Sequence, residues 1–159
     1  MEISCDFRTS VEKALTEIDE TWRDYQGLIV CGTHTPLEVE TLIDRIREAR
    51  EKGFPALLIC FGYQLGAIEY ARSVLGIKDA TSEEFGEGTF VVKKRPELKV
   101  GLHDGESWWS NYEVVIEWEK PENFFASQFH PEYQSSKEKP HPLLVGFINY
   151  CKSYGSNRA

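Results

Sequence analysis

The fold of this chain is decided by the stretch Phe54-Pro-Ala-Leu-Leu-Ile-Cys-Phe-Gly-Tyr-Gln-Leu-Gly66. It opens with an apolar run of strand length, residues 56–59, and passes through Cys60 and Gly62 into a segment whose apolar residues recur at helical spacing. The pattern predicts a strand, a sharp turn and a helix. At such a turn the cysteine stands at the start of the helix, where free N–H groups and the helix dipole favour its thiolate.

A strand, a sharp turn and a helix around a reactive side chain form a nucleophile elbow. A simpler interpretation is that Cys60 ends a buried strand, because free cysteine is among the residues most often buried. Short motifs recur freely in unrelated proteins, so this stretch alone leaves both interpretations open.

A second stretch, Phe124-Phe-Ala-Ser-Gln-Phe-His-Pro-Glu-Tyr133, favours the reactive cysteine. Its first half is apolar and aromatic enough to form a strand, and Pro131 biases His130 towards an extended backbone. In an extended chain residues i and i+2 point the same way, so His130 and Glu132 share a face. A carboxylate there can orient the imidazole while the other ring nitrogen takes a proton from a thiol, which predicts a triad with Cys60. Without Cys60, the ordinary interpretation would be an exposed His and Glu at a strand edge.

These two stretches, in this order, resemble the class I glutamine amidotransferases, whose glutaminase domains carry a cysteine elbow and a later His-Pro-Glu. Within that superfamily, residues 27–85 and 112–147 are similar to the glutaminase domain of CTP synthases. The resemblance implies a flavodoxin-like α/β fold without a cofactor. It also implies that Cys60, His130 and Glu132 are the catalytic residues.

The order of strand and helix signals indicates the same fold class. Residues 28–31 predict a second buried strand, followed by a helix that runs towards Gly53. Alternating strands and helices imply a mainly parallel sheet with helices on both faces, and residues 112–119 add a small antiparallel piece. With 159 residues, 41% of them hydrophobic, we expect one domain, 1–159. Reactive groups gather at the C-terminal ends of such strands, so the turn at Gly32 should lie beside the elbow.

Composition excludes several classes of partner. The net charge is -8 and the pI is near 5.1, which argues against nucleic-acid or anionic-membrane binding. The chain has no apolar run long enough to span a membrane and no signal peptide, so we expect a cytoplasmic protein. The cysteines, which also include Cys5, Cys31 and Cys151, lack metal-ligand spacing. We therefore expect reduced thiols, with no disulfide and no metal.

The resemblance also implies an oxyanion hole, made by the backbone N–H groups of Thr33 and Phe61, with Gly32 beside the substrate. Two positions depart from the family pattern. The family carries glycine where Thr33 stands, and it carries glycine where Leu58 places a bulky side chain before the turn. A misplaced donor matters because one oxyanion-hole hydrogen bond contributes several kcal/mol to catalysis.

By the same resemblance, Gln64, Glu69, Asn111 and Tyr112 are the remaining substrate-binding positions. Glu69 would accept hydrogen bonds from the α-amino group of glutamine; the alternative is a solvated helix position. Asn111 stands where the family has an arginine that binds the substrate carboxylate. Loss of a bidentate guanidinium predicts weaker glutamine binding or a different substrate.

The expected function is hydrolysis of glutamine, or of a related γ-glutamyl amide, through a thioester on Cys60. Ammonia would pass to a separate synthetase partner, because the synthetase portion of CTP synthase has no counterpart in this sequence. The competing hypothesis is a catalytically silent binding or regulatory module. The departures at Thr33, Leu58 and Asn111 favour it, and the complete triad opposes it. The oligomeric state is not predicted.

Overall fold

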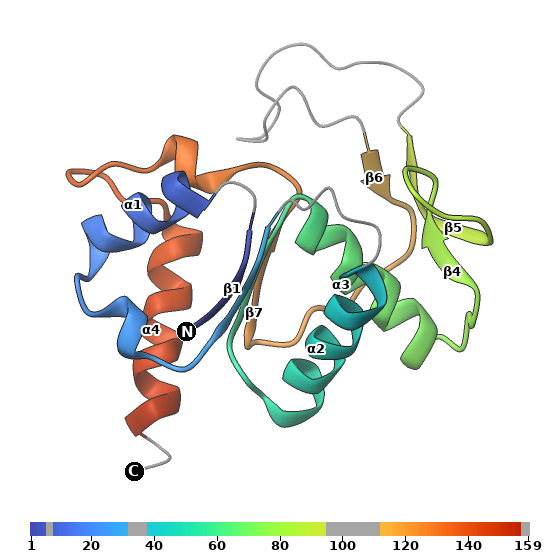
Figure 1. The fold of residues 1–159 in the computed structure, drawn as a ribbon, viewed down its shortest axis with the longest axis horizontal. Helices are drawn as coiled ribbons and strands as arrows, with labels where there is room; N and C mark the ends of the chain where they lie inside the picture. Colours follow the sequence, from blue (N-terminus) through green and yellow to red (C-terminus); the bar gives the residue numbers. More distant parts are fainter. Residues whose placement is uncertain (6–7, 32–37, 95–111, 157–159) are drawn as a thin grey trace.

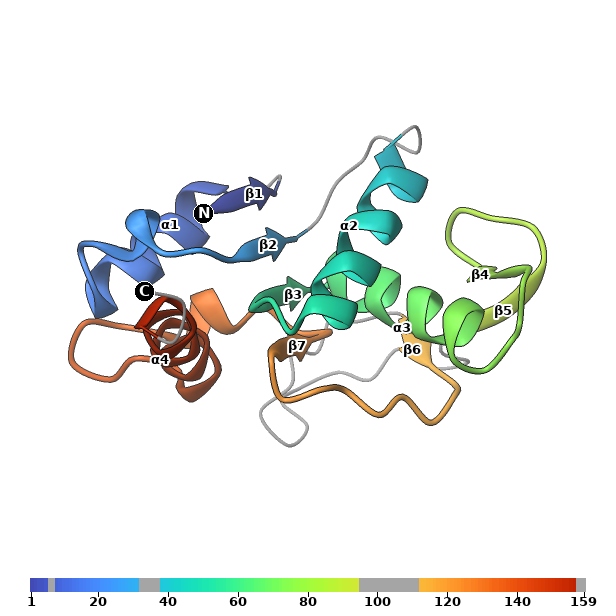
Figure 2. The same cartoon turned by 90° about the horizontal axis from the view of Figure 1, so that it is seen from below.

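The computed structural model describes residues 1–5, 8–31, 38–94 and 112–156. Its main sheet has four parallel strands in the order β1-β2-β3-β7 (Figures 1 and 2). Their bounds are Glu2–Ser4, Leu28–Val30, Ala56–Ile59 and Phe124–Ser127. This arrangement confirms the expected parallel sheet and brings the C-terminal ends of all four strands to one edge.

Two pairs of helices cover the two faces of this sheet (Figure 2). One face carries α1 (Arg8–Ile18) and α4 (Pro142–Ser156), and the other carries α2 (Val39–Lys52) and α3 (Phe61–Ser73). The helix predicted towards Gly53 ends there, since Gly53 adopts a left-handed backbone (φ 71°) and its N–H donates to the carbonyl of Ala49.

The central strand β3 explains why a short apolar run organises the fold. Its alternate residues Ala56 and Leu58 pack towards α2 and α3, while Leu57 and Ile59 pack towards α1 and α4. All four are completely buried. A strand buried on both faces needs a continuous apolar sequence, which is what the chain carries here.

A separate three-stranded sheet packs against α3 (Figure 1). It consists of β4 (Ala80–Ser82), β5 (Thr89–Lys94) and β6 (Tyr112–Val114). The β4–β5 pairing is parallel and only β5–β6 is antiparallel. The small addition is therefore a mixed sheet of its own. The sequence did not predict this, because strand patterns locate strands without indicating which strand each one pairs with.

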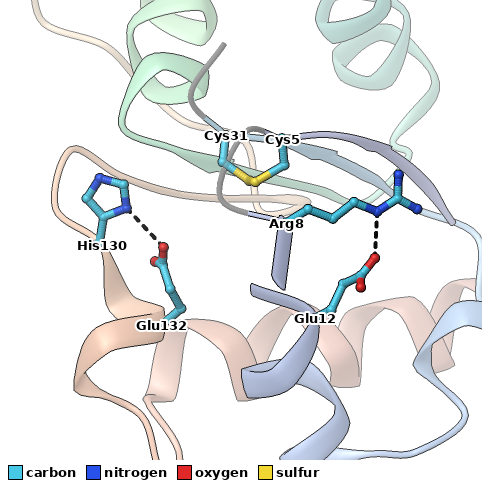
Figure 3. Close-up of a disulfide and its surroundings, with 6 residues drawn as sticks. All are labelled: Cys5, Arg8, Glu12, Cys31, His130 and Glu132. Atoms are coloured by element: carbon cyan, nitrogen blue, oxygen red, sulfur yellow. Dashed lines mark hydrogen bonds and ion pairs between the residues drawn. A yellow bond between two sulfur atoms is a disulfide. The ribbon is translucent and has the colours of Figure 1, made fainter. Parts of the chain in front are cut away.

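The expectation of four reduced cysteines is wrong for one pair. Cys5 and Cys31 follow β1 and β2 directly and form a disulfide with Cα atoms 4.5 Å apart (Figure 3). The Cys31 N–H also donates to the carbonyl of Ser4 at 2.9 Å. In-register parallel strands bring these two residues side by side although 26 positions separate them, so their spacing carried no signal of the pairing.

Across the described ranges, the helices are all too short or too polar to cross a membrane.

Candidate active site

Cys60 occupies a strained turn between β3 and α3. Its backbone has φ 56° and ψ -102°, and it is the single non-glycine residue with positive φ among those the structure describes. Such a conformation costs on the order of 1–3 kcal/mol and persists only where its surroundings hold it. Here the Cys60 N–H donates to the carbonyl of Ser127, at the end of β7, at 2.8 Å. The predicted strand, sharp turn and helix are therefore present, with Cys60 at the turn.

Glycines provide the space in which the elbow packs. A Cβ at Gly62 would lie 2.8 Å from the carbonyl carbon of Val30, so the first turn of α3 rests directly on the end of β2. Leu58, the bulky departure from the family pattern, is completely buried. Its Cδ1 lies 2.8 Å from where a Cβ of Gly66 would stand. Because Gly66, one turn further along α3, has no side chain, the Leu58 side chain has space to pack there.

His130 and Glu132 form a buried pair after β7. The His130 Nδ1 lies 2.9 Å from Glu132 Oε2, and each residue is 5% exposed (Figure 3). The backbone of His130 is extended, as predicted (φ -97°, ψ 95°). The contact does not arise from two residues of an extended strand, however, because a 3-10 turn, Pro131–Gln134, begins directly after His130 and carries Glu132 back.

The charge state of His130 links the pair to the elbow. Burial acts to lower the pKa of its imidazole, but hydrogen bonds with Cys60 and Glu132, together with their negative charges, raise that pKa to about 9. The structure thus brings all three residues of the predicted triad together. An imidazolium at neutral pH is the counter-charge that a nucleophilic thiolate requires.

Gln128 is a neighbour of Cys60 that the sequence did not predict. Its Nε2 lies 3.6 Å from the Cys60 Sγ. The only signal for it was position, since Gln128 directly follows β7 and stands two residues before His130.

Cys60 is the one cysteine whose thiol is both not paired in a disulfide and partly exposed. It is partly exposed, whereas Cys151 is buried and its burial raises the pKa of the thiol to about 12. Cys5 and Cys31 are joined to each other. In the described part of the chain, no group of three or more His, Cys, Asp or Glu side chains could hold a metal ion.

Comparison with known proteins identifies the family. The family model for class-I glutamine amidotransferases matches residues 3–107. The chain belongs to this family. Curated relatives include the CTP synthase of Methanoculleus marisnigri, which is 33% identical over an alignment of 186 residues. The alignment covers 84% of this chain and 35% of the relative. The CTP synthase of Archaeoglobus fulgidus is 31% identical over 196 residues, covering 88% and 37%. The chain therefore spans about a third of the length of these relatives.

A solved structure shares the fold of this amidotransferase chain. It is the glutaminase domain of Trypanosoma brucei CTPS with bound acivicin, at 20% sequence identity and a TM-score of 0.70. The match covers 96% of this chain and 94% of that one. At this level of identity, the likeness confirms the flavodoxin-like architecture.

Among the substrate positions expected for an amidotransferase, Gln64 lies in the best-defined surroundings. It is 2% exposed, and its Oε1 accepts a hydrogen bond from the Ser82 hydroxyl at 3.2 Å. The same hydroxyl accepts the backbone N–H of Glu84 at 3.2 Å. Burial, and after it the charges of Glu84 and Glu83, raise the pKa of Tyr112 at the start of β6. One neighbourhood at α3 therefore contains Gln64, Ser82, Glu84 and Tyr112. The sequence predicted only Gln64 and Tyr112 as site residues.

Glu69 lies elsewhere. It is 1% exposed, and its two carboxylate oxygens accept hydrogen bonds from Arg50 of α2, at 2.5 and 3.1 Å. It also lies eight residues beyond Phe61, about 12 Å along the helix axis. The prediction that Glu69 binds the substrate amino group finds no support in this geometry, because Arg50 already engages both oxygens.

Phe61 is the first residue of α3. Its N–H has no acceptor within the helix, as is general for a first turn, and it follows the nucleophile directly. The other predicted positions, Gly32, Thr33 and Asn111, lie outside the described residues. Their roles remain predictions.

Proposed function

We propose that this chain hydrolyses the side-chain amide of glutamine, or of a related γ-glutamyl compound, with Cys60 as the nucleophile. The observation that carries the proposal is the position of the buried His130, which lies 2.9 Å from Glu132 and also contacts Cys60; these contacts raise the pKa of its imidazole to about 9. An isolated buried histidine would instead be neutral, since burial disfavours the charged form.

The chemistry follows from these positions. The Cys60 thiolate attacks the γ-carbonyl carbon, and the oxyanion that forms lies at the N–H of Phe61, with Thr33 as the second donor. His130 gives its proton to the departing nitrogen, ammonia leaves, and a γ-glutamyl thioester remains. His130 then takes a proton from water, which attacks the thioester, and glutamate is released as the thiolate reforms.

We propose that the neighbourhood of Gln64, Ser82, Glu84 and Tyr112 recognises the substrate. Glu84 is exposed and lies near Tyr112, so its carboxylate is available to a positively charged amino group, in contrast to Glu69. A carboxylate is the partner that an ammonium needs. Asn111 would meet the substrate carboxylate with an amide instead of a guanidinium, which predicts a high KM for glutamine.

The ammonia requires an acceptor. The matched relatives are named CTP synthases and are about three times as long as the part that aligns with this chain. We propose that the ammonia passes to a synthetase partner, in keeping with the name of these relatives.

The test is release of glutamate and ammonia from glutamine by the purified protein, compared with Cys60→Ala. Cys151→Ala is the matched control, because it removes a buried thiol with a strongly raised pKa. We expect turnover in the wild type and the control and none in Cys60→Ala. Acivicin should also protect Cys60 from alkylation. Absence of turnover in all three proteins would overturn autonomous hydrolysis and favour a silent or partner-activated module.

A further inference from the structure

Gln128 stands directly across from the nucleophile. Ile59 pairs with Ser127 in the β3–β7 register, so the next residues along the two strands, Cys60 and Gln128, leave the sheet side by side. The Cys60 N–H donates to the Ser127 carbonyl, which holds the two strand ends together. The approach of Gln128 Nε2 to the sulfur, at 3.6 Å, therefore rests on backbone geometry on both sides.

The two ends of the Gln128 amide have different surroundings. Its Nε2 faces the sulfur, while its Oε1 is buried and accepts no hydrogen bond from any described residue. Leaving a buried carbonyl oxygen unpaired is unfavourable by about 1–3 kcal/mol. A thiolate accepts hydrogen bonds and cannot donate one, so only the NH2 end of the amide suits a charged sulfur.

We propose that Gln128 is a thiolate-stabilising donor of this active site, holding the Cys60 sulfur in its charged form and in the orientation for attack through its Nε2–H. The inference rests on the proposed function, in which that thiolate is the nucleophile. It adds a neutral donor to the imidazolium of His130 and the N-terminus of α3. Unlike His130, Gln128 neither gains nor loses a proton in the reaction, so it stabilises the sulfur over the whole working pH range.

The experiment measures the pH dependence of Cys60 alkylation by iodoacetamide, followed by mass spectrometry, and it needs no glutamine turnover. Gln128→Met keeps the length of the side chain and removes the donor. Gln128→Glu keeps its shape and places a negative charge against the sulfur. Gln134→Glu is the matched control, because it makes the same change on an exposed residue of the same segment.

A hydrogen bond to a charged group corresponds to a factor of about ten in the thiolate population. We expect the alkylation profile of Gln128→Met to move to higher pH, so that on the rising limb of the profile this variant is alkylated about tenfold more slowly than the wild type. Gln128→Glu should move it further, and Gln134→Glu should follow the wild type. Each variant is first shown to unfold cooperatively; if Gln128→Glu does not fold, Gln128→Met decides.

Profiles of folded Gln128→Met that superimpose on the wild type would overturn the proposal. The outcome is separable from that of the proposed function. A wild type that hydrolyses glutamine while the Gln128 variants keep its alkylation profile contradicts only the role of Gln128. Shifted profiles in a protein without turnover contradict only the hydrolysis.

Discussion

Replacing Gly62 by alanine tests how closely the elbow is built. The new Cβ would lie 2.8 Å from the carbonyl carbon of Val30 and closer still to its oxygen. Ordinary contacts between carbon atoms are about 3.5–4.0 Å. Both groups belong to the backbone or are attached to it directly, so no side-chain rotation relieves the contact. The first turn of α3 must therefore move away from β2 by roughly 1 Å.

The sign of the stability change is diagnostic. Gly62 is not among the glycines with left-handed backbone, and in an open helix alanine is more stable than glycine by about 1 kcal/mol. Overpacking costs about 1–3 kcal/mol and more where backbone must shift. We expect a net loss of about 2 kcal/mol. Since Cys60 and the Phe61 N–H move with the helix, any turnover should fall on the order of 100-fold.

Thermal unfolding provides the assay, and Gly155→Ala provides the control. Gly155 lies in the last turn of α4, and a Cβ there would have no neighbour within 4 Å among the described atoms. For a chain of this size we expect the control to melt within about 2 °C of the wild type, because helix propensity counts for less in a terminal turn, and Gly62→Ala to melt about 4–8 °C lower. A Gly62→Ala protein as stable as the control would refute the direct packing of α3 on β2.

Three further predictions concern charges and the disulfide. Because the pKa of His130 is raised from 6.5 to about 9, its contribution to stability is complete below about pH 6.5 and is lost as pH rises through 9. In urea unfolding, the free energy of unfolding of the wild type should fall with rising pH by up to about 3 kcal/mol relative to that of His130→Gln. Parallel curves of this free energy against pH for the two proteins would contradict the prediction. Glu69→Gln should lower the free energy of unfolding by about 2 kcal/mol. The loss is smaller than for a fully buried ion pair because Arg50 is 21% exposed. An unchanged free energy of unfolding would mean that the ion pair makes no net contribution to stability. Thiol titration of the denatured, unreduced protein should count two free thiols, and four would disprove the disulfide. Replacing Cys5 and Cys31 together by serine should cost about 3.5 kcal/mol.

Local patterns predicted the elements that position Cys60. The run at residues 56–59 is apolar throughout because β3 is buried on both faces, and Gly62 marks the contact of α3 with β2. Pro131 restricts the backbone of His130, and the observed extended conformation follows. Each of these signals lies within a short stretch of the chain, so it can be recognised in the sequence.

Other features depended on contacts that no local pattern encodes. Glu69 was expected to face a ligand, but α2 lies along α3 and Arg50 engages it. The partners of the short strands β4 and β6 were equally hidden, since strand propensity is the same for either sheet.

The amino-acid sequence by itself determined the parallel α/β class, the elbow at Cys60 and the presence of a His-Pro-Glu segment, because steric limits and apolar periodicity act over a few residues. Only the tertiary structure decided that β3 and β7 are neighbours, and with this that Cys60 meets Gln128 and His130. It alone joined Cys5 to Cys31 and raised the pKa of His130. Burial and pairing across long sequence separations set these properties, and they exist only once the chain has folded.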